Sequence, residues 1–127
     1  MANDYLTEVL EKLEDNPTSA DLDFFLEAFA RVGYLASVAQ GKSEHAEQNR
    51  RLAEAMAYAD ARRKGARSSA DAERDAIVRT NSERVEEINA RESAAKLKHL
   101  LNSIEQTING IKYLGRQTDA PMNLPRR

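Results

Sequence analysis

The chain has 127 residues with a net charge of −2 and no cysteine, so disulfides and thiolate metal sites are excluded. Charged residues make up 31% of it and its mean hydropathy is −0.68, which leaves much of the surface as solvated helix. Many of the hydrophobic residues are alanines, so few bulky side chains are available for a core.

The amino-terminal residues lack the apolar run of a secretory signal peptide. No other stretch is long and apolar enough to span a membrane. We therefore expect a cytoplasmic protein with no membrane partner.

Residues 4–14 are predicted to form a short amphipathic helix. Pro17 should end it, because proline disfavours helix at the residue before it. Thr18 or Ser19 is the expected N-cap of the next helix, with Asp21 in the position of a capping-box acid.

Residues 19–64 contain the most apolar part of the chain, which we expect to be core. Its apolar positions at helical spacing are Leu22, Phe25, Leu26, Phe29, Val32 and Leu35. Gly41 leaves two possibilities open: one continuous helix, or two helices with Ser43 capping the second.

Residues 64–69 are predicted to be a loop, with Gly65 in a left-handed conformation and Ser69 as the next N-cap. Residues 70–115 are predicted to be one helix, since Gly110 alone could interrupt them. From residue 116 the sequence has no periodicity.

The last third of this predicted helix carries a seam of aliphatic side chains at steps of four and three. Its members are Leu97, Leu101, Ile104, Ile108 and Ile111. Its cover could be the helix of the same chain that carries Phe25 and Phe29, or the same seam of a second protomer. The spacing is typical of a coiled-coil interface and the seam is long, so we expect it to mediate homo-oligomerisation.

The predicted fold is all-α. A short N-terminal helix precedes two long helices that form an extended helical hairpin and assemble through the C-terminal helix. Residues 1–116 are expected to be a single helical domain, and residues 117–127 a flexible tail.

Basic residues gather near the loop, in a segment from 41 to 67 with a net charge of +3. Cations with a nearby tyrosine can contact phosphates and stack on an unpaired base, which indicates single-stranded nucleic acid. The candidate residues are Arg50, Arg51, Tyr58, Arg62, Arg63, Lys64 and Arg67. The alternative is that these cations only complement the helix dipole and keep the loop soluble.

An enzyme is not expected. His45 and His99 have no partner at ligand spacing, and Glu86 and Glu87 are adjacent and so do not converge on one helix face. Nucleotide-binding, nucleophile and metalloprotease motifs are missing, so no cofactor and no metal are predicted.

The order of features across residues 34–115 resembles the UvsY-type phage recombination mediators. The resemblance is carried by the basic run Ala61-Arg62-Arg63-Lys64, the glycine-containing loop, and the final Ile111-Lys112 to Gly115 pattern. It implies a basic middle helix on single-stranded DNA, a C-terminal helix that drives ring-like assembly, and a recombinase and a single-strand-binding protein as partners.

Two functions follow as hypotheses. The first is a helical, homo-oligomeric accessory protein that binds single-stranded DNA in phage recombination or replication. The second is a purely structural assembly protein, such as a virion or scaffold component, without nucleic-acid binding.

Overall fold

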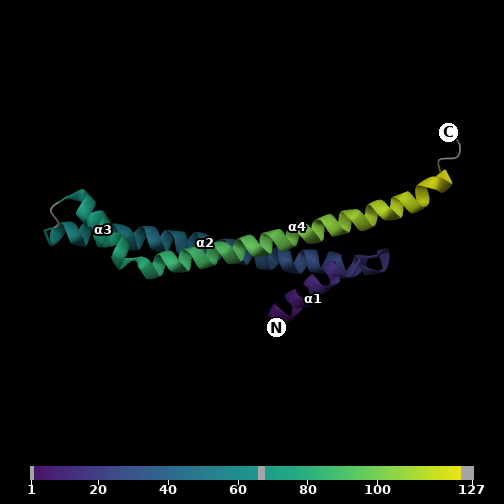
Figure 1. The fold of residues 1–127 in the computed structure, drawn as a ribbon, viewed down its shortest axis with the longest axis horizontal. Helices are drawn as coiled ribbons and strands as arrows, with labels where there is room; N and C mark the ends of the chain where they lie inside the picture. The colour runs from purple at the N-terminus through teal and green to yellow at the C-terminus, as the bar shows by residue number, and fades with distance from the viewer. Residues whose placement is uncertain (1, 66–67, 124–127) are drawn as a thin grey trace. The chain divides into compact units, whose positions relative to one another are not determined.

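The computed structural model describes the backbone of residues 2–65 and 68–123, and the side chains of residues 4–65 and 68–115. Within these ranges the chain is helical and contains no strand, which confirms the all-α prediction (Figure 1). The elements are α1 (Ala2–Glu14), η1 (Ser19–Asp21), α2 (Leu22–Arg63), α3 (Ser69–Arg79) and α4 (Asn81–Asn123). None of the described helices has the length and apolar character needed to cross a bilayer.

The connection from α1 to α2 is organised by Thr18, one of the two predicted caps, which begins η1. Its backbone N–H donates to Asp21 Oδ2 at 2.9 Å, and this hydrogen bond holds the pKa of Asp21 below its usual value. The carboxylate thereby satisfies a donor that has no partner within the helix. Just before the cap, Asn16 adopts a positive φ of 40°, a conformation that asparagine tolerates better than most residues.

α2 is one uninterrupted helix that passes through both Gly33 and Gly41. It ends at a loop in which Gly65 has a φ of 96°, as the left-handed prediction required. The N-cap of α3 is Ser68 rather than the predicted Ser69, because it is the Ser68 hydroxyl that accepts the Asp71 backbone N–H at 3.1 Å.

The prediction of one continuous helix over residues 70–115 is wrong. Thr80 leaves helical geometry, with φ −104° and ψ 22°, and separates α3 from α4. Its hydroxyl donates to the Ala76 carbonyl at 2.7 Å, while its own carbonyl accepts the Arg84 N–H of the first turn of α4. Further along, the backbone of α4 stays helical to Asn123, past residue 116, and residues 124–127 of the predicted tail lie outside the described residues.

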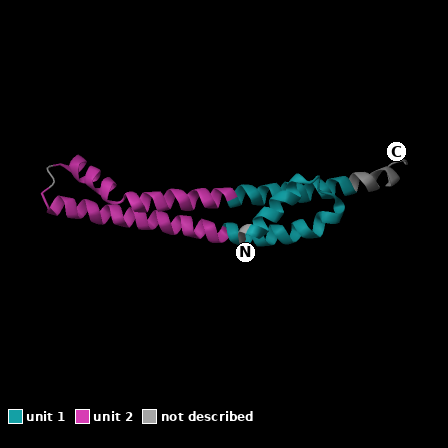
Figure 2. Cartoon of the chain, turned by 60° about the horizontal axis from the view of Figure 1, so that its bottom comes forward, with its two compact units in different colours: residues 1–36, 97–127 teal, residues 37–96 magenta. Residues whose placement is uncertain are grey.

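Contacts within the chain group into two compact units, shown in different colours in Figure 2. Unit 1 comprises residues 1–36 and 97–127, and unit 2 comprises residues 37–96. Both α2 and α4 therefore contribute a segment to each unit.

Unit 1 is built on an apolar core shared by α1, α2 and α4. Its buried members are Val9, Phe25, Ala28, Val32, Ile104, Ile108 and Ile111, with Leu97 and Leu101 packed against them. All five residues of the predicted seam thus contact side chains of their own chain. Burial of the seam needs no second copy, so the argument for oligomerisation through it no longer holds.

Unit 2 has a different interior. Its buried residues are Ala61, Ala72, Ala76, Thr80, Glu87 and Ala94. Arg50 and Glu54 of α2 form ion pairs with Glu87 and Arg84 of α4, respectively, so the two segments run antiparallel here. Small side chains let the two backbones approach, and ion pairs fill the remaining space.

Candidate nucleic-acid interface

Three of the predicted nucleic-acid-binding residues share one side of α2 in unit 2. Arg51, Tyr58 and Arg62 follow at intervals of seven and four residues, which is two turns and then one turn of an α-helix. Arg51 and Arg62 are exposed and Tyr58 is half-buried. We call this side of α2 the Arg51–Arg62 flank.

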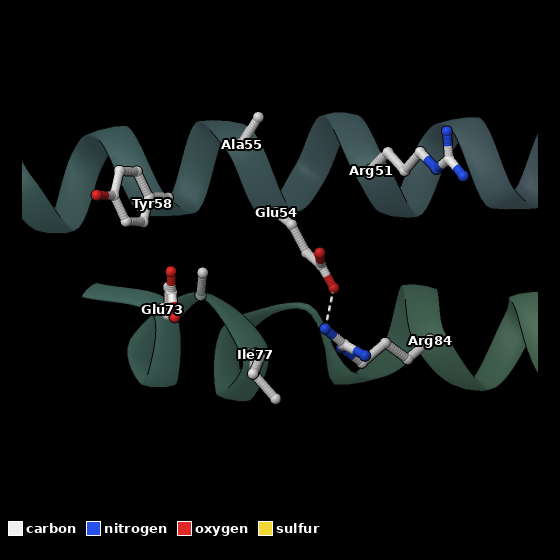
Figure 3. A pocket seen from close by; sticks show the side chains of 8 residues that line it. Arg51, Glu54, Ala55, Tyr58, Glu73, Ile77 and Arg84 are labelled. Atoms are coloured by element: carbon white, nitrogen blue, oxygen red, sulfur yellow. Dashed lines mark ion pairs between the residues drawn. The ribbon is translucent and has the colours of Figure 1, made fainter. Parts of the chain in front are cut away.

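Beside the flank lies a cavity of about 460 Å³. Its lining residues are Arg51, Glu54, Ala55, Tyr58, Glu73, Ala76, Ile77 and Arg84. Figure 3 shows side chains of α2 on one side of it, and side chains of α3 and the start of α4 on the other. This volume falls within the range of pockets that hold small ligands, and is large enough for a single planar ring system.

The polar side of the cavity is formed by Glu54 and Arg84, which make an ion pair (dashed line in Figure 3). The Nε of Arg84 is buried and has no hydrogen-bond partner among the described residues. Buried donors are normally paired, so the unpaired Nε is an exception among the buried polar groups of unit 2.

Arg50 is not part of this surface, contrary to the prediction. Its Nε donates to Glu87 Oε1 at 2.9 Å and a terminal nitrogen donates to Oε2 at 3.3 Å, a two-point contact between guanidinium and carboxylate. Glu87 is 6% exposed and also accepts from Arg91 at 3.0 Å. The hydrogen bond between Arg50 and Glu87 lowers the pKa of Glu87 and raises the pKa of Arg50.

The sequence did contain a signal for the role of Arg50. On a helix it falls on the same side as Ala46, Ala53 and Ala57, the face that packs against α4. An arginine on an alanine face is positioned to pair with a neighbouring helix. Glu87, whose carboxylate completes that pair, was missed as an important residue.

Asp60 reduces the effective charge of the basic end of α2. It forms ion pairs with Arg79 at 2.7 Å, Lys64 at 3.1 Å and Arg63 at 3.4 Å. The hydrogen bond from Arg79, followed by that from Lys64, holds the pKa of Asp60 below its usual value. Arg63 and Lys64 nevertheless remain largely exposed, with 77% and 68% of their side-chain surface accessible.

Arg62 differs from its neighbours because no carboxylate among the described residues pairs with it, and Arg67 lies outside those residues. His45 and His99 are both exposed. In the described part of the chain, no three histidine, cysteine, aspartate or glutamate side chains come together in a way that could hold a metal ion.

The chain was compared with known protein families, with characterised proteins and with solved structures, and none of them matches it. The resemblance to the phage mediators therefore stays a prediction based on residues 34–115.

Proposed function

We propose that the chain is a helical accessory protein that binds single-stranded DNA through the Arg51–Arg62 flank. The observation that carries this proposal is the position of Tyr58. Its ring lines a cavity, and exposed arginines precede and follow it on the same side of one helix. Aromatic rings beside backbone-binding cations are the usual means of holding an unpaired strand.

The dimensions of the flank suit such a strand. Arg51 and Arg62 are eleven residues apart, which is about 16 Å at the rise of an α-helix. That length lets the two guanidinium groups contact different phosphates, while a base between them stacks on Tyr58.

Arg63 and Lys64 add to the flank but share the Asp60 carboxylate, and Arg51 pairs with Glu47 at 3.0 Å. The phosphate backbone must therefore compete with a carboxylate for each of these three cations. Because the total binding energy of one chain is small, several chains acting on one strand would gain by avidity. A recombinase, a single-strand-binding protein and a cytoplasmic site of action complete the proposal.

Binding of a fluorescent single-stranded oligonucleotide, measured over a range of salt concentrations, tests the role of the two arginines. Replacing both Arg51 and Arg62 by alanine should weaken binding and reduce the slope of log affinity against log salt by about 1.4, at roughly 0.7 per phosphate contact. The matched control replaces Lys42 and Arg74, two exposed cations away from the flank. If both variants lost affinity equally, the oligonucleotide would be bound through overall positive charge alone, and the flank would be rejected as the binding site.

Tyr58 needs a separate test, because its ring also contributes to the packing of unit 2. Tyr58→Phe keeps the stacking surface and should retain affinity, whereas Tyr58→Ala should lose about 1–3 kcal/mol of binding energy. The melting temperature of each variant is measured alongside. If Tyr58→Ala lowers the melting temperature but leaves oligonucleotide affinity intact, the ring is structural only.

A second candidate function is an assembly protein that binds no nucleic acid. It is favoured by the large aliphatic side chains of unit 2, which are exposed rather than buried. Failure of the wild-type chain to bind any oligonucleotide at low salt would favour this function over the first.

A further inference from the structure

Every valine, leucine, isoleucine and methionine of unit 2 is exposed. These residues are Val38, Leu52, Met56, Ile77, Val78, Val85 and Ile88, with exposed fractions from 39% to 75%. Single exposed aliphatics are ordinary on a protein surface. A whole unit with alanines and ion pairs inside and its aliphatics outside indicates that part of its surface is covered by something else.

The outward side of α2 carries a symmetric pattern around His45. Val38 and Leu52 lie seven residues before and after it, and Tyr34 and Met56 lie eleven residues before and after it. At 100° per residue these five positions fall within a narrow stripe along the helix. All five side chains are exposed, and Tyr34, Leu52 and Met56 are each more than 60% accessible.

The charges at the two ends of the stripe continue this symmetry with opposite signs. Glu27 lies eighteen residues before His45 and Arg63 eighteen residues after it, and both are exposed. The first turn of α2 also holds an acid, Asp23, and the last turn is basic.

We propose that α2 pairs with α2 of a second copy of this chain, in antiparallel orientation, about a two-fold axis at His45. This arrangement places Val38 opposite Leu52 of the other copy, Tyr34 opposite Met56, and Glu27 opposite Arg63. The four apolar positions then face one another, and the acid Glu27 faces the base Arg63. A self-complementary pattern of this kind is what a two-fold symmetric interface requires.

A parallel pair would match the same aliphatic side chains, but it would set Glu27 against Glu27 and Arg63 against Arg63. Like charges at such flanking positions are destabilising, and they commonly determine helix orientation in coiled coils. An unrelated partner would give no reason for the pattern to be symmetric within one helix. The symmetric pattern of α2 thus favours a second copy of the chain as the partner.

Sedimentation of the full chain in the high micromolar range tests the pairing. The wild type should be a dimer, and replacing Leu52 and Met56 by glutamate should give a monomer with unchanged helix content, since neither side chain is buried within the chain. The control replaces Val78 and Val85, two exposed aliphatics outside α2, and should remain a dimer. A monomeric wild type, or a dimer that only the control variant disrupts, would overturn the proposal.

Single cysteines test the axis, because the natural chain has none. His45→Cys should form a disulfide-linked dimer under mild oxidation, since residue 45 meets its own symmetry mate within the reach of a disulfide. Val38→Cys alone and Leu52→Cys alone should not cross-link, whereas a mixture of the two should. Self-linking of Val38→Cys as efficient as that of His45→Cys would instead indicate a parallel pair and reject the proposed axis.

This pairing does not depend on DNA binding. Leu52 and Met56 lie outside the Arg51–Arg62 flank residues that were proposed to contact the strand. The dimerisation variants and the Arg51 and Arg62 variants can therefore fail independently.

Discussion

Units 1 and 2 are built from the same two long helices but are stabilised in opposite ways. In unit 1, valine, phenylalanine and isoleucine side chains from α1, α2 and α4 fill an apolar core. In unit 2, the buried surface is alanine, threonine and one glutamate, and the aliphatic side chains are outside. One helix can therefore change the chemistry of its packing face halfway along its length.

The difference shows what each unit can be used for. Apolar burial in unit 1 supplies most of the stabilising free energy and needs no partner. The interior of unit 2 depends on the Arg50–Glu87 and Glu54–Arg84 ion pairs, which gain little once the loss of hydration is counted. Its outer surface is free to hold charged and apolar side chains for binding.

The largest expected effect compares one isoleucine from each unit. Ile104 is 0% exposed in unit 1, and Ile88 is 49% exposed in unit 2. Ile104→Ala should lower the free energy of unfolding by about 2–5 kcal/mol, because a fully buried side chain leaves a cavity. Ile88→Ala should change it by no more than about 0.5 kcal/mol, as expected for a surface site.

Urea denaturation followed by circular dichroism measures both variants. Comparable losses at the two positions would mean that Ile88 is buried in solution, by this chain or by another. Repeating the measurement at several protein concentrations separates these cases, because only association makes stability depend on concentration.

The second prediction concerns the ion pair that replaces an apolar core in unit 2. Glu87→Leu removes the two-point partner of Arg50 and leaves the half-buried guanidinium with Glu54 alone. The change should lower the free energy of unfolding by about 1–3 kcal/mol. Changing Arg50 to leucine in the same chain should recover most of this loss, since an apolar pair can replace a buried ion pair. A double variant no more stable than Glu87→Leu would show that the ion pair itself specifies the packing.

The sequence predicted the helical class, the break at Pro17, a cap at Thr18 or Ser19 and the left-handed Gly65, because each depends on neighbouring residues alone. It missed the break at Thr80, where no proline or glycine is present and the interruption rests on a threonine hydroxyl bonded to Ala76. It located the seam on one helix face but could not decide between the helix of Phe25 and a second protomer as its cover, because those side chains are distant in sequence.

The candidate site was predicted only in part, because it too depends on contacts between residues distant in sequence. The assumption that charged residues face solvent held for Arg51 and Arg62 and failed for Arg50. Asp60, which offsets Arg63 and Lys64, and the cavity beside Tyr58 depend on where α3 packs. That position is set by the turn at Thr80, so missing the turn also hid the cavity.

Acid should weaken unit 2 through Glu87 and Asp60. Their pKa values are lowered by hydrogen bonds from Arg50 and Arg79, respectively, so each ionised carboxylate adds stability that is fully present above its usual pKa. This contribution is lost as the pH falls below about 4.5 for Glu87 and about 3.8 for Asp60, through the lower values of the folded state.

Hydrogen exchange at stepped pH, corrected for the intrinsic exchange rate, measures this loss for amides of each unit. In unit 1, Asp21 is also affected, but its hydrogen bond from Thr18 holds only the short turn before α2. Amides near Glu87 should therefore lose protection in acid before those near Ile104. Glu87→Gln should make protection in unit 2 less dependent on pH, and equal acid sensitivity of both units would contradict the comparison.

The smallest expected effect uses two glycines in the interior of α2, one in each unit. Glycine in a helix is less favourable than alanine by about 1 kcal/mol, so both Gly33→Ala and Gly41→Ala should stabilise the chain. A methyl group at Gly33 would lie 3.8 Å from Leu101 Cδ1, an ordinary contact with the core of unit 1, whereas at Gly41 nothing lies within 4 Å. Gly33→Ala should therefore raise the free energy of unfolding through helix propensity and through a small packing contribution, whereas Gly41→Ala should raise it through helix propensity alone. The measurement is made at low protein concentration, where pairing of α2 contributes nothing. If Gly33→Ala were destabilising while Gly41→Ala stabilised, the core of unit 1 would be too tightly packed at this point to accept even one methyl group.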